Sequence, residues 1–216
     1  PKCGMQLPEG EDVKFCPNCG VSLAHQVGYV ETSPFEMRVE APKERRIGTL
    51  KSRLMVFAIA LVLSLAVTSL GATAKLETSE AQDIVQETDT IRDALEVAGV
   101  PIIFGNNLMQ TLMMFIPGLG SLWGFYVLYN TGRVIAAIGI VAKVDPLLLF
   151  ATLFIYPFAW LEYISYSLAI SESLWLAYAA VRHSFKRELV TASKVIAICA
   201  VLLLLAAFME MAMIAS

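Results

Sequence analysis

The chain has 216 residues, of which 57% are apolar and 16% charged, and its mean hydropathy is +0.65. These values lie outside the usual range of soluble proteins and indicate a membrane protein. The formal net charge of −3 says little about partners, because the charges are unevenly distributed along the chain. Four uncharged runs are long enough to enter a bilayer: 54–74, 97–132, 146–161 and 195–209.

The N-terminal sequence PKCGMQLPEGEDVKFCPNCG contains one complete Cys-x-x-Cys turn and half of another. Cys16 and Cys19 belong to CPNCG, whereas Cys3 stands in PKCG with no cysteine three residues before it. Zinc ribbons hold a tetrahedral ion between two such turns, each followed by glycine. We therefore predict a small β zinc ribbon over residues 1–24, with Cys3, Cys16 and Cys19 as zinc ligands.

The fourth ligand of this ribbon is missing from the printed sequence. We expect it just before Pro1, because a cysteine there would make both turns read CP(K/N)CG, and because the chain lacks an initiator methionine. His25 is the rival ligand, although its spacing suits a ribbon poorly. Free or disulfide-bonded thiols are a further alternative, and a cytoplasmic location disfavours the disulfides. A site of four thiolates is closed, so zinc would stabilise this module rather than catalyse a reaction.

The predicted ribbon is not basic, since two lysines stand against three acidic residues within it. Nucleic-acid binding therefore receives little support, and docking to a cytoplasmic protein is favoured. Residues 25–53 contain prolines and mixed charge, which is typical of a linker. Residues 54–216 are predicted to form the transmembrane helical domain.

The distribution of charge predicts the orientation of the chain in the membrane. Residues 43–53 contain five basic side chains, and residues 75–96 contain seven acidic side chains against two basic ones. Under the positive-inside rule the N-terminus is cytoplasmic and the acidic segment lies outside. The first apolar run begins too far into the chain to be a cleavable signal peptide.

Five transmembrane helices are predicted. The first covers 54–74, and residues 78–97 then show helix-like apolar spacing, which favours an amphipathic helix outside the membrane over a solvated loop. The sequence PGLG at 117–120 divides the longest apolar run into a hairpin of 102–116 and 119–142. Within it, Gly120 and Gly124 have the GxxxG spacing of closely packed helices.

The last two predicted spans follow from a second basic cluster at 182–194. A helix beginning at Pro146 must return to the cytoplasm, and an amphipathic interfacial helix is expected between 171 and 194. The alternative assigns 174–181 to the end of a long or re-entrant helix. Residues 195–214 form the final span, which places the C-terminus outside. The fold class is therefore an all-α polytopic membrane bundle with a small β zinc ribbon.

Several polar residues interrupt the apolar runs: Asn106, Asn107, Gln110, Asn130, Arg133, Glu162 and Glu210. Polar groups in a bilayer need partners, so a cluster of Asn106, Asn107, Asn130, Arg133 and Glu162 is predicted, with Arg133 and Glu162 as an ion pair. The amides are interpreted as contacts that hold helices together, with a transport site as the alternative.

The stretches IFGNNLMQTLMMFIPGLGSLWGFYVLYNTG and YPFAWLEYISYSLA resemble the stage II sporulation protein M family over roughly residues 77–190. Asn106 and Asn107 match the paired asparagines of its first motif, and Asn130 with Gly132 matches the second with one inserted threonine. Pro157 and Glu162 match its third motif.

The third motif also departs from the family pattern. Phe158 stands where the family has histidine, and Ala159 where it has glycine. A catalytic or metal-binding role of that histidine would therefore be absent. The resemblance implies a non-enzymatic membrane component, which in sporulating bacteria belongs to a complex that remodels the cell wall. A ribbon fused to such a domain resembles an archaeal architecture.

The leading hypothesis is a non-catalytic membrane scaffold or complex subunit. The ribbon would dock a cytoplasmic partner, and the helices would assemble in the lipid bilayer with other membrane proteins or with a second copy. The sequence contains no HExxH, GxGxxG, phosphate-binding loop or nucleophile elbow. A transporter or channel with the polar cluster along its path is the alternative. An enzyme that uses Glu162 as acid or base is the third hypothesis.

Overall fold

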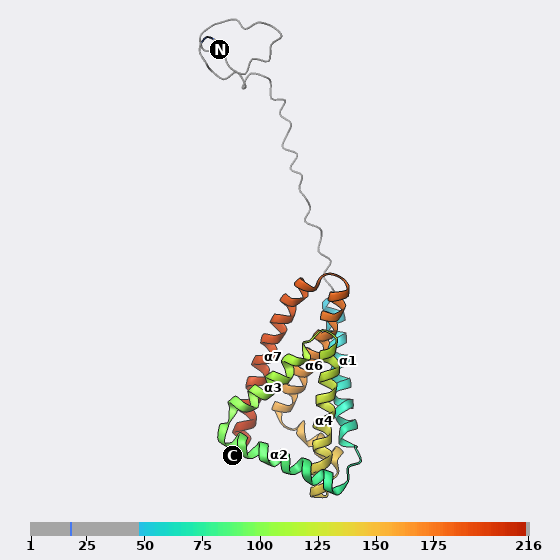
Figure 1. Cartoon of the computed structure of the whole chain (residues 1–216), viewed down its shortest axis with the longest axis vertical. Coiled ribbons are helices and arrows are strands. Elements are labelled where there is room, and N and C mark those ends of the chain that lie inside the picture. Colours follow the sequence, from blue (N-terminus) through green and yellow to red (C-terminus); the bar gives the residue numbers. More distant parts are fainter. Residues whose placement is uncertain (1–17, 19–47, 215–216) are drawn as a thin grey trace. The chain divides into compact units, whose positions relative to one another are not determined.

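The computed structural model describes Asn18 and residues 48–214 (Figure 1). The predicted ribbon ligands Cys3, Cys16 and Cys19 lie outside the described residues, as does most of the predicted linker. The helices of the described part are α1 (Leu50–Ala72), α2 (Thr78–Ala98), α3 (Val100–Met114), α4 (Leu119–Ala142), α5 (Pro146–Leu153), α6 (Pro157–Val181) and α7 (Phe185–Ile214). The described part contains no strand, so the all-α prediction is confirmed there.

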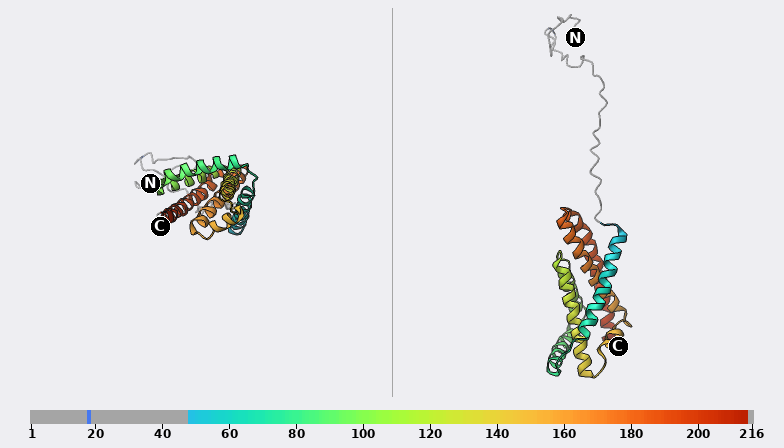
Figure 2. Two further views of the ribbon diagram at one scale, coloured as in Figure 1. Left: turned by 90° about the horizontal axis from the view of Figure 1, so that it is seen from below. Right: turned by 90° about the vertical axis from the view of Figure 1, so that its right-hand side faces the viewer.

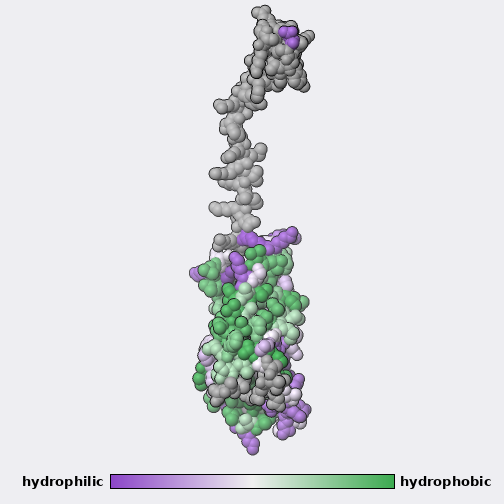
Figure 3. Space-filling model, turned by 90° about the vertical axis from the view of Figure 1, so that its left-hand side faces the viewer, coloured by the Kyte–Doolittle hydropathy of each residue, from purple (hydrophilic) through white to green (hydrophobic). Residues whose placement is uncertain are grey.

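Four of these helices, α1, α4, α6 and α7, are long and apolar enough to cross a membrane. Large aliphatic side chains stay exposed along them, for example Val62 on α1 and Val201 on α7. Figure 3 shows apolar residues over most of one face of the bundle and polar residues gathered toward its ends. Such a surface suits lipid rather than water. The described part is therefore a multi-pass membrane bundle.

Helix α2 connects α1 to α3 at the end of the bundle where α1 ends (Figures 1 and 2). It begins at Thr78, as the apolar spacing of 78–97 predicts, and the alternative of a solvated loop is wrong. Ala81 is fully buried, whereas Glu87 and Asp89 are exposed. An amphipathic helix with one small buried face can lie across the ends of other helices while its acidic face remains in water.

The hairpin of α3 and α4 turns inside the bundle. Gly118 has a φ of +73°, and its N–H donates to the carbonyl of Ser173 on α6 at 3.2 Å. Ser173 Oγ donates to Ile116 O at 2.7 Å and accepts from Ser121 N at 3.2 Å. These bonds satisfy backbone groups at the turn, which a bilayer interior would otherwise leave without partners.

The length of α3 bears on the predicted number of spans. Helix α3 has 15 residues, which is about 22 Å at 1.5 Å per residue. A hydrocarbon core of about 30 Å requires roughly 20 residues. The turn after α3 docks at Ser173, two turns of α6 before that helix ends at Val181. By length and composition, four helices of the described residues could cross a membrane, one fewer than the five predicted, because the predicted span 102–116 forms the shorter helix α3.

The region after Pro146 also differs from prediction. Pro146 begins only the short helix α5, capped by Asp145, and α6 then runs without interruption to Val181. The predicted interfacial helix over 171–194 is wrong, and its alternative, the end of a long helix, is correct. The pattern misleads because the polar residues Ser171, Glu172 and Ser173 are buried among neighbouring helices rather than facing water.

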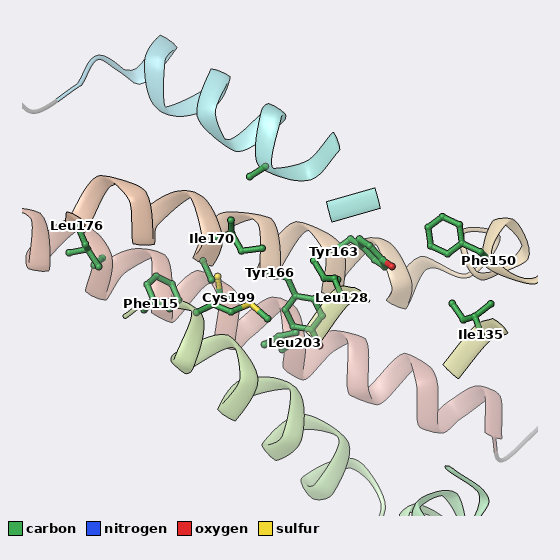
Figure 4. Packing of buried hydrophobic residues seen from close by; sticks show 14 of the residues in the cluster. Phe115, Leu128, Ile135, Phe150, Tyr163, Tyr166, Ile170, Leu176, Cys199 and Leu203 are labelled. Carbon is green, nitrogen blue, oxygen red and sulfur yellow. The ribbon is translucent and has the colours of Figure 1, made fainter. Parts of the chain in front are cut away.

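The centre of the bundle is a compact apolar core (Figure 4). Met114, Leu128, Ile170 and Leu203 are fully buried and come from α3, α4, α6 and α7 respectively. Cys199 of α7 is also fully buried. The short helix α3 is therefore held in the bundle by packing.

Candidate polar site between the helices

A cavity of about 610 Å³ lies among α3, α4, α6 and α7, with Ile91 of α2 also at its wall. Its polar lining comprises Asn106, Asn107, Gln110, Thr131, Glu162, Tyr163, Tyr166 and Glu210. Three of the five residues predicted to cluster, Asn106, Asn107 and Glu162, thus share one cavity.

A hydrogen bond between α3 and α6 is the central contact of this cavity. Asn107 Nδ2 donates to Glu162 Oε1 at 2.7 Å. Glu162 lies in the second turn of α6, after the helix begins at Pro157, and Asn107 lies in the middle of α3. A carboxylate accepts an amide hydrogen strongly where water is scarce. This pair fixes the rotation of α3 relative to α6.

Gln110 extends the polar face of α3, because it follows Asn107 by three residues. Its Oε1 accepts a hydrogen bond from Trp123 Nε1 of α4 at 3.1 Å. Asn106 lines the same cavity and is exposed. One face of α3 is therefore bonded to both α4 and α6, which agrees with the interpretation of these amides as interhelical contacts.

The other two residues of the predicted cluster lie elsewhere. Asn130 Nδ2 donates to Tyr126 O within its own helix at 2.8 Å. Arg133 pairs with Glu80 of α2 at 2.5 Å, so the predicted ion pair with Glu162 is wrong. Both partners of the observed pair are partly exposed, and a charge pair in contact with water avoids the desolvation that a pair inside the bundle would require.

Glu210 is the acidic cavity residue that the predicted cluster leaves out. It lies on α7, one turn before the helix ends at Ile214, and is half-buried. An acid near the end of an apolar run is usually interpreted as reaching water. The packing of α7 against α3 and α6 brings this acid to the same cavity as Glu162.

Close backbone contact joins α1 to α4 beside this site. A Cβ added to Gly132 would lie 2.1 Å from Thr68 O, and one added to Gly71 would lie 2.2 Å from Tyr129 O. Only glycine permits this approach at either position. The predicted GxxxG pair is divided between two neighbours, since Gly120 contacts the end of α3 and Gly124 contacts Ile170 of α6.

A row of hydroxyl groups holds α1 against α6. Tyr163 Oη donates to Thr68 Oγ1 at 3.0 Å, and Ser167 Oγ donates to Ser64 Oγ at 3.3 Å. The two α1 residues are four apart, as are the two α6 residues, so each pair occupies one helix face. All four side chains are buried, and each hydroxyl finds a partner in the neighbouring helix.

A buried charge cluster closes the opposite end of the bundle, and the sequence pattern does not reveal it. Arg53 of α1 donates to Glu172 Oε2 of α6 at 3.2 Å and to Glu188 of α7. Its guanidinium also lies 4.9 Å from the ring centroid of Trp175. The two glutamate side chains are only 5% and 4% exposed. We call Arg53, Glu172 and Glu188 the charge clasp.

The described residues contain no group of three or more His, Cys, Asp or Glu side chains that could hold a metal ion. The predicted zinc ligands are not among those residues. The hydrogen bonds at the cavity, the glycine contact, the hydroxyl row and the charge clasp each hold helices of the bundle together. Fold and site together define a polytopic helical membrane protein.

The comparison with protein families identifies the family of this membrane protein. Residues 53–213 match the family described as Stage II sporulation protein M. The chain belongs to this family, and the resemblance noted in its motifs is confirmed. The comparison with curated proteins gave no match, and neither did the comparison with solved structures.

Proposed function

We propose that this protein is a non-catalytic subunit of a membrane complex, in which the helix bundle is a scaffold and the N-terminal segment docks a cytoplasmic protein. The observation that carries the proposal is the use of polar side chains inside the bundle. Asn107, Gln110 and the charge clasp bond to side chains of other helices. Polar groups used in this way specify how helices pack.

The apolar core supports a scaffold rather than a conduit. Along α6, the cavity residue Tyr166 is followed one turn later by the fully buried Ile170, and Glu172 of the charge clasp comes after it. Cys199 and Leu203 of α7 pack into the same core (Figure 4). A closely packed apolar core between two polar regions opposes the passage of a solute.

Purification with partners tests the scaffold directly. Mild detergent extraction, chemical crosslinking and mass spectrometry should recover defined membrane proteins, or a second copy of the chain, in fixed stoichiometry. The test variant is Glu162→Leu, which removes the hydrogen-bond acceptor of Asn107. It should weaken the packing of the bundle and, with it, the assembly with partners. A strictly monomeric protein with no reproducible partner would contradict the proposal.

A transporter is the second candidate, favoured by the two carboxylates and three amides that line one cavity. Half-buried acids in transporters commonly bind ions or protons. Proteoliposomes that contain the purified protein would show flux of a small cation or of protons, and Glu162→Gln would abolish it. Such a result would replace the scaffold proposal, whereas proteoliposomes that show no flux would support it.

The zinc ribbon is a separate part of the proposal, supported by the CPNCG turn and the half turn at Cys3. Zinc would be held by thiolates as a structural ion and would order the docking module. Elemental analysis of the purified protein should give one zinc per chain. Replacement of Cys16 and Cys19 by serine should remove the metal and the cytoplasmic partner but leave the bundle folded.

A further inference from the structure

A second cavity, of about 510 Å³, lies beside the charge clasp between the first turns of α1 and α7. From α1 and the residues before it the lining includes Gly48, Thr49, Leu50 and Arg53; from α7 it includes Arg187, Glu188, Thr191 and Lys194. Among these described lining residues three are basic and one is acidic. We propose that this cavity binds the phosphate headgroup of an anionic phospholipid.

The position of the cavity along the membrane normal supports a lipid. Arg53 is the last charged residue before the apolar run of α1, and Lys194 is the last before that of α7. Both residues line the same cavity. Two spanning helices therefore place their boundary charges around one space, which is where the headgroup region meets the hydrocarbon.

The geometry of α7 concentrates positive charge on that space. Arg187, Thr191 and Lys194 follow at intervals of four and three, so they share one helix face. Arg187 is half-buried and Lys194 is exposed. A lysine at this depth can direct its ammonium group back toward a phosphate while its aliphatic stem lies along lipid.

The opposite wall is the N-terminus of α1, which is a 23-residue helix. Thr49 caps it by accepting from Ser52 N at 3.2 Å. The positive end of the helix dipole is therefore directed at the cavity, and it adds to the field of the basic side chains. Leu50 lines the cavity and is 75% exposed, so an acyl chain has an apolar surface to follow.

The charge clasp explains why the site tolerates one acid. Glu188 lines the cavity, yet its carboxylate is bound to Arg53 and only 4% of its side chain is exposed. Arg53 faces two carboxylates in the clasp, so it compensates one of their two negative charges. With Glu172 counted beside the lining, three basic side chains stand against two acids, which leaves a net attraction for a phosphate diester.

Native mass spectrometry of the full chain in detergent tests the proposal. Phosphatidylglycerol and phosphatidylcholine with identical acyl chains are added in turn, and the bound fraction is measured. We expect phosphatidylglycerol to be retained over phosphatidylcholine, and Lys194→Gln to weaken its binding about fivefold. Equal retention of the two lipids by the unaltered chain would overturn the proposal.

Lys186→Gln is the matched control, because Lys186 is an exposed lysine of the same helix that does not line the cavity. It should change binding less than about twofold, since screened surface charge acts weakly at a distance. An equal loss of lipid binding in Lys186→Gln and Lys194→Gln would indicate general attraction to surface charge and would overturn the proposed site. Thr191→Val provides a second variant with unchanged charge, and it should weaken binding through the lost hydroxyl alone.

Inorganic phosphate distinguishes a lipid from a free anion, which share the same phosphate chemistry. In vesicles of phosphatidylcholine with one fifth phosphatidylglycerol, millimolar phosphate should leave the lipid bound, because the acyl chains add apolar contacts. Displacement of the lipid by phosphate at that concentration would assign the cavity to a free anion and overturn the lipid proposal.

Discussion

The side-chain amide of Asn107 on α3 donates a 2.7 Å hydrogen bond to Glu162 on α6, across the polar cavity. This bond joins α3, which has 15 residues, to α6, which is long and apolar enough to cross a membrane. Together with the docking of the α3–α4 turn on Ser173, it fixes the middle and the C-terminal end of α3. Polar contacts thus hold the short helix at the site.

Replacement of Asn107 by alanine should destabilise the bundle by about 1 kcal/mol, the usual size of an interhelical hydrogen bond in membranes. Unfolding in a denaturing detergent, followed by tryptophan fluorescence, measures the change. Asn106→Ala is the control and should cost less, because Asn106 is exposed. A larger loss at position 106 would show that the pair is not the principal contact of this face.

Glu162→Gln should keep the fold, because glutamine retains the Oε1 acceptor that Asn107 requires. Glu162→Ala should destabilise the protein, since the amide of Asn107 then loses its partner. The same unfolding assay, applied to both variants side by side, checks the difference. If glutamine and alanine were equally destabilising, the charge rather than the hydrogen bond would be what matters.

A methyl group at Gly132 should force α1 and α4 apart, because the added Cβ would lie 2.1 Å from a backbone oxygen. We expect Gly132→Ala to cost about 1–3 kcal/mol, the range for overpacking. Gly105→Ala is the control, since an added Cβ there has no atom within 4 Å, and alanine favours a helix. It should be neutral or slightly stabilising, so equal losses at the two positions would refute the contact.

Arg53→Ala should be among the most destabilising single changes in the bundle, because it leaves Glu172 and Glu188 buried without their cation. Breaking a buried pair costs about 3–5 kcal/mol. The triple variant Arg53→Met, Glu172→Gln and Glu188→Gln should recover most of that loss. Arg182→Ala removes an exposed arginine that lies over Tyr178, and it should cost less than about 1 kcal/mol. A failure of the triple variant to recover stability would argue against electrostatics as the cause.

Accessibility labelling checks the orientation of the bundle. Helix α2 and the α6–α7 turn lie at opposite ends of α1 (Figure 2). In a background where Cys3, Cys16 and Cys19 are serine, Glu87→Cys should react with an impermeant maleimide in intact cells, and Lys186→Cys only after permeabilisation. Cys199 is buried and should give little background. Reaction of both sites from the same side would contradict the positive-inside assignment.

The sequence by itself determined that the chain enters a membrane, that α2 is an amphipathic helix, and that the PGLG segment is a turn. It also identified Asn106, Asn107 and Glu162 as residues that lie together. These features follow from composition, periodicity and the cost of polar groups in lipid, all of which are local properties of the chain.

Only the tertiary structure decided where each helix begins and ends and which partners the charges take. The polar residues 171–173 resemble a water-facing surface in sequence, yet they are buried because α1, α7 and the α3–α4 turn supply their contacts. Arg133 likewise meets Glu80 instead of Glu162 because α2 folds back over α4. Periodicity reports that a face is polar, but whether water or another helix covers that face depends on residues far away in the chain.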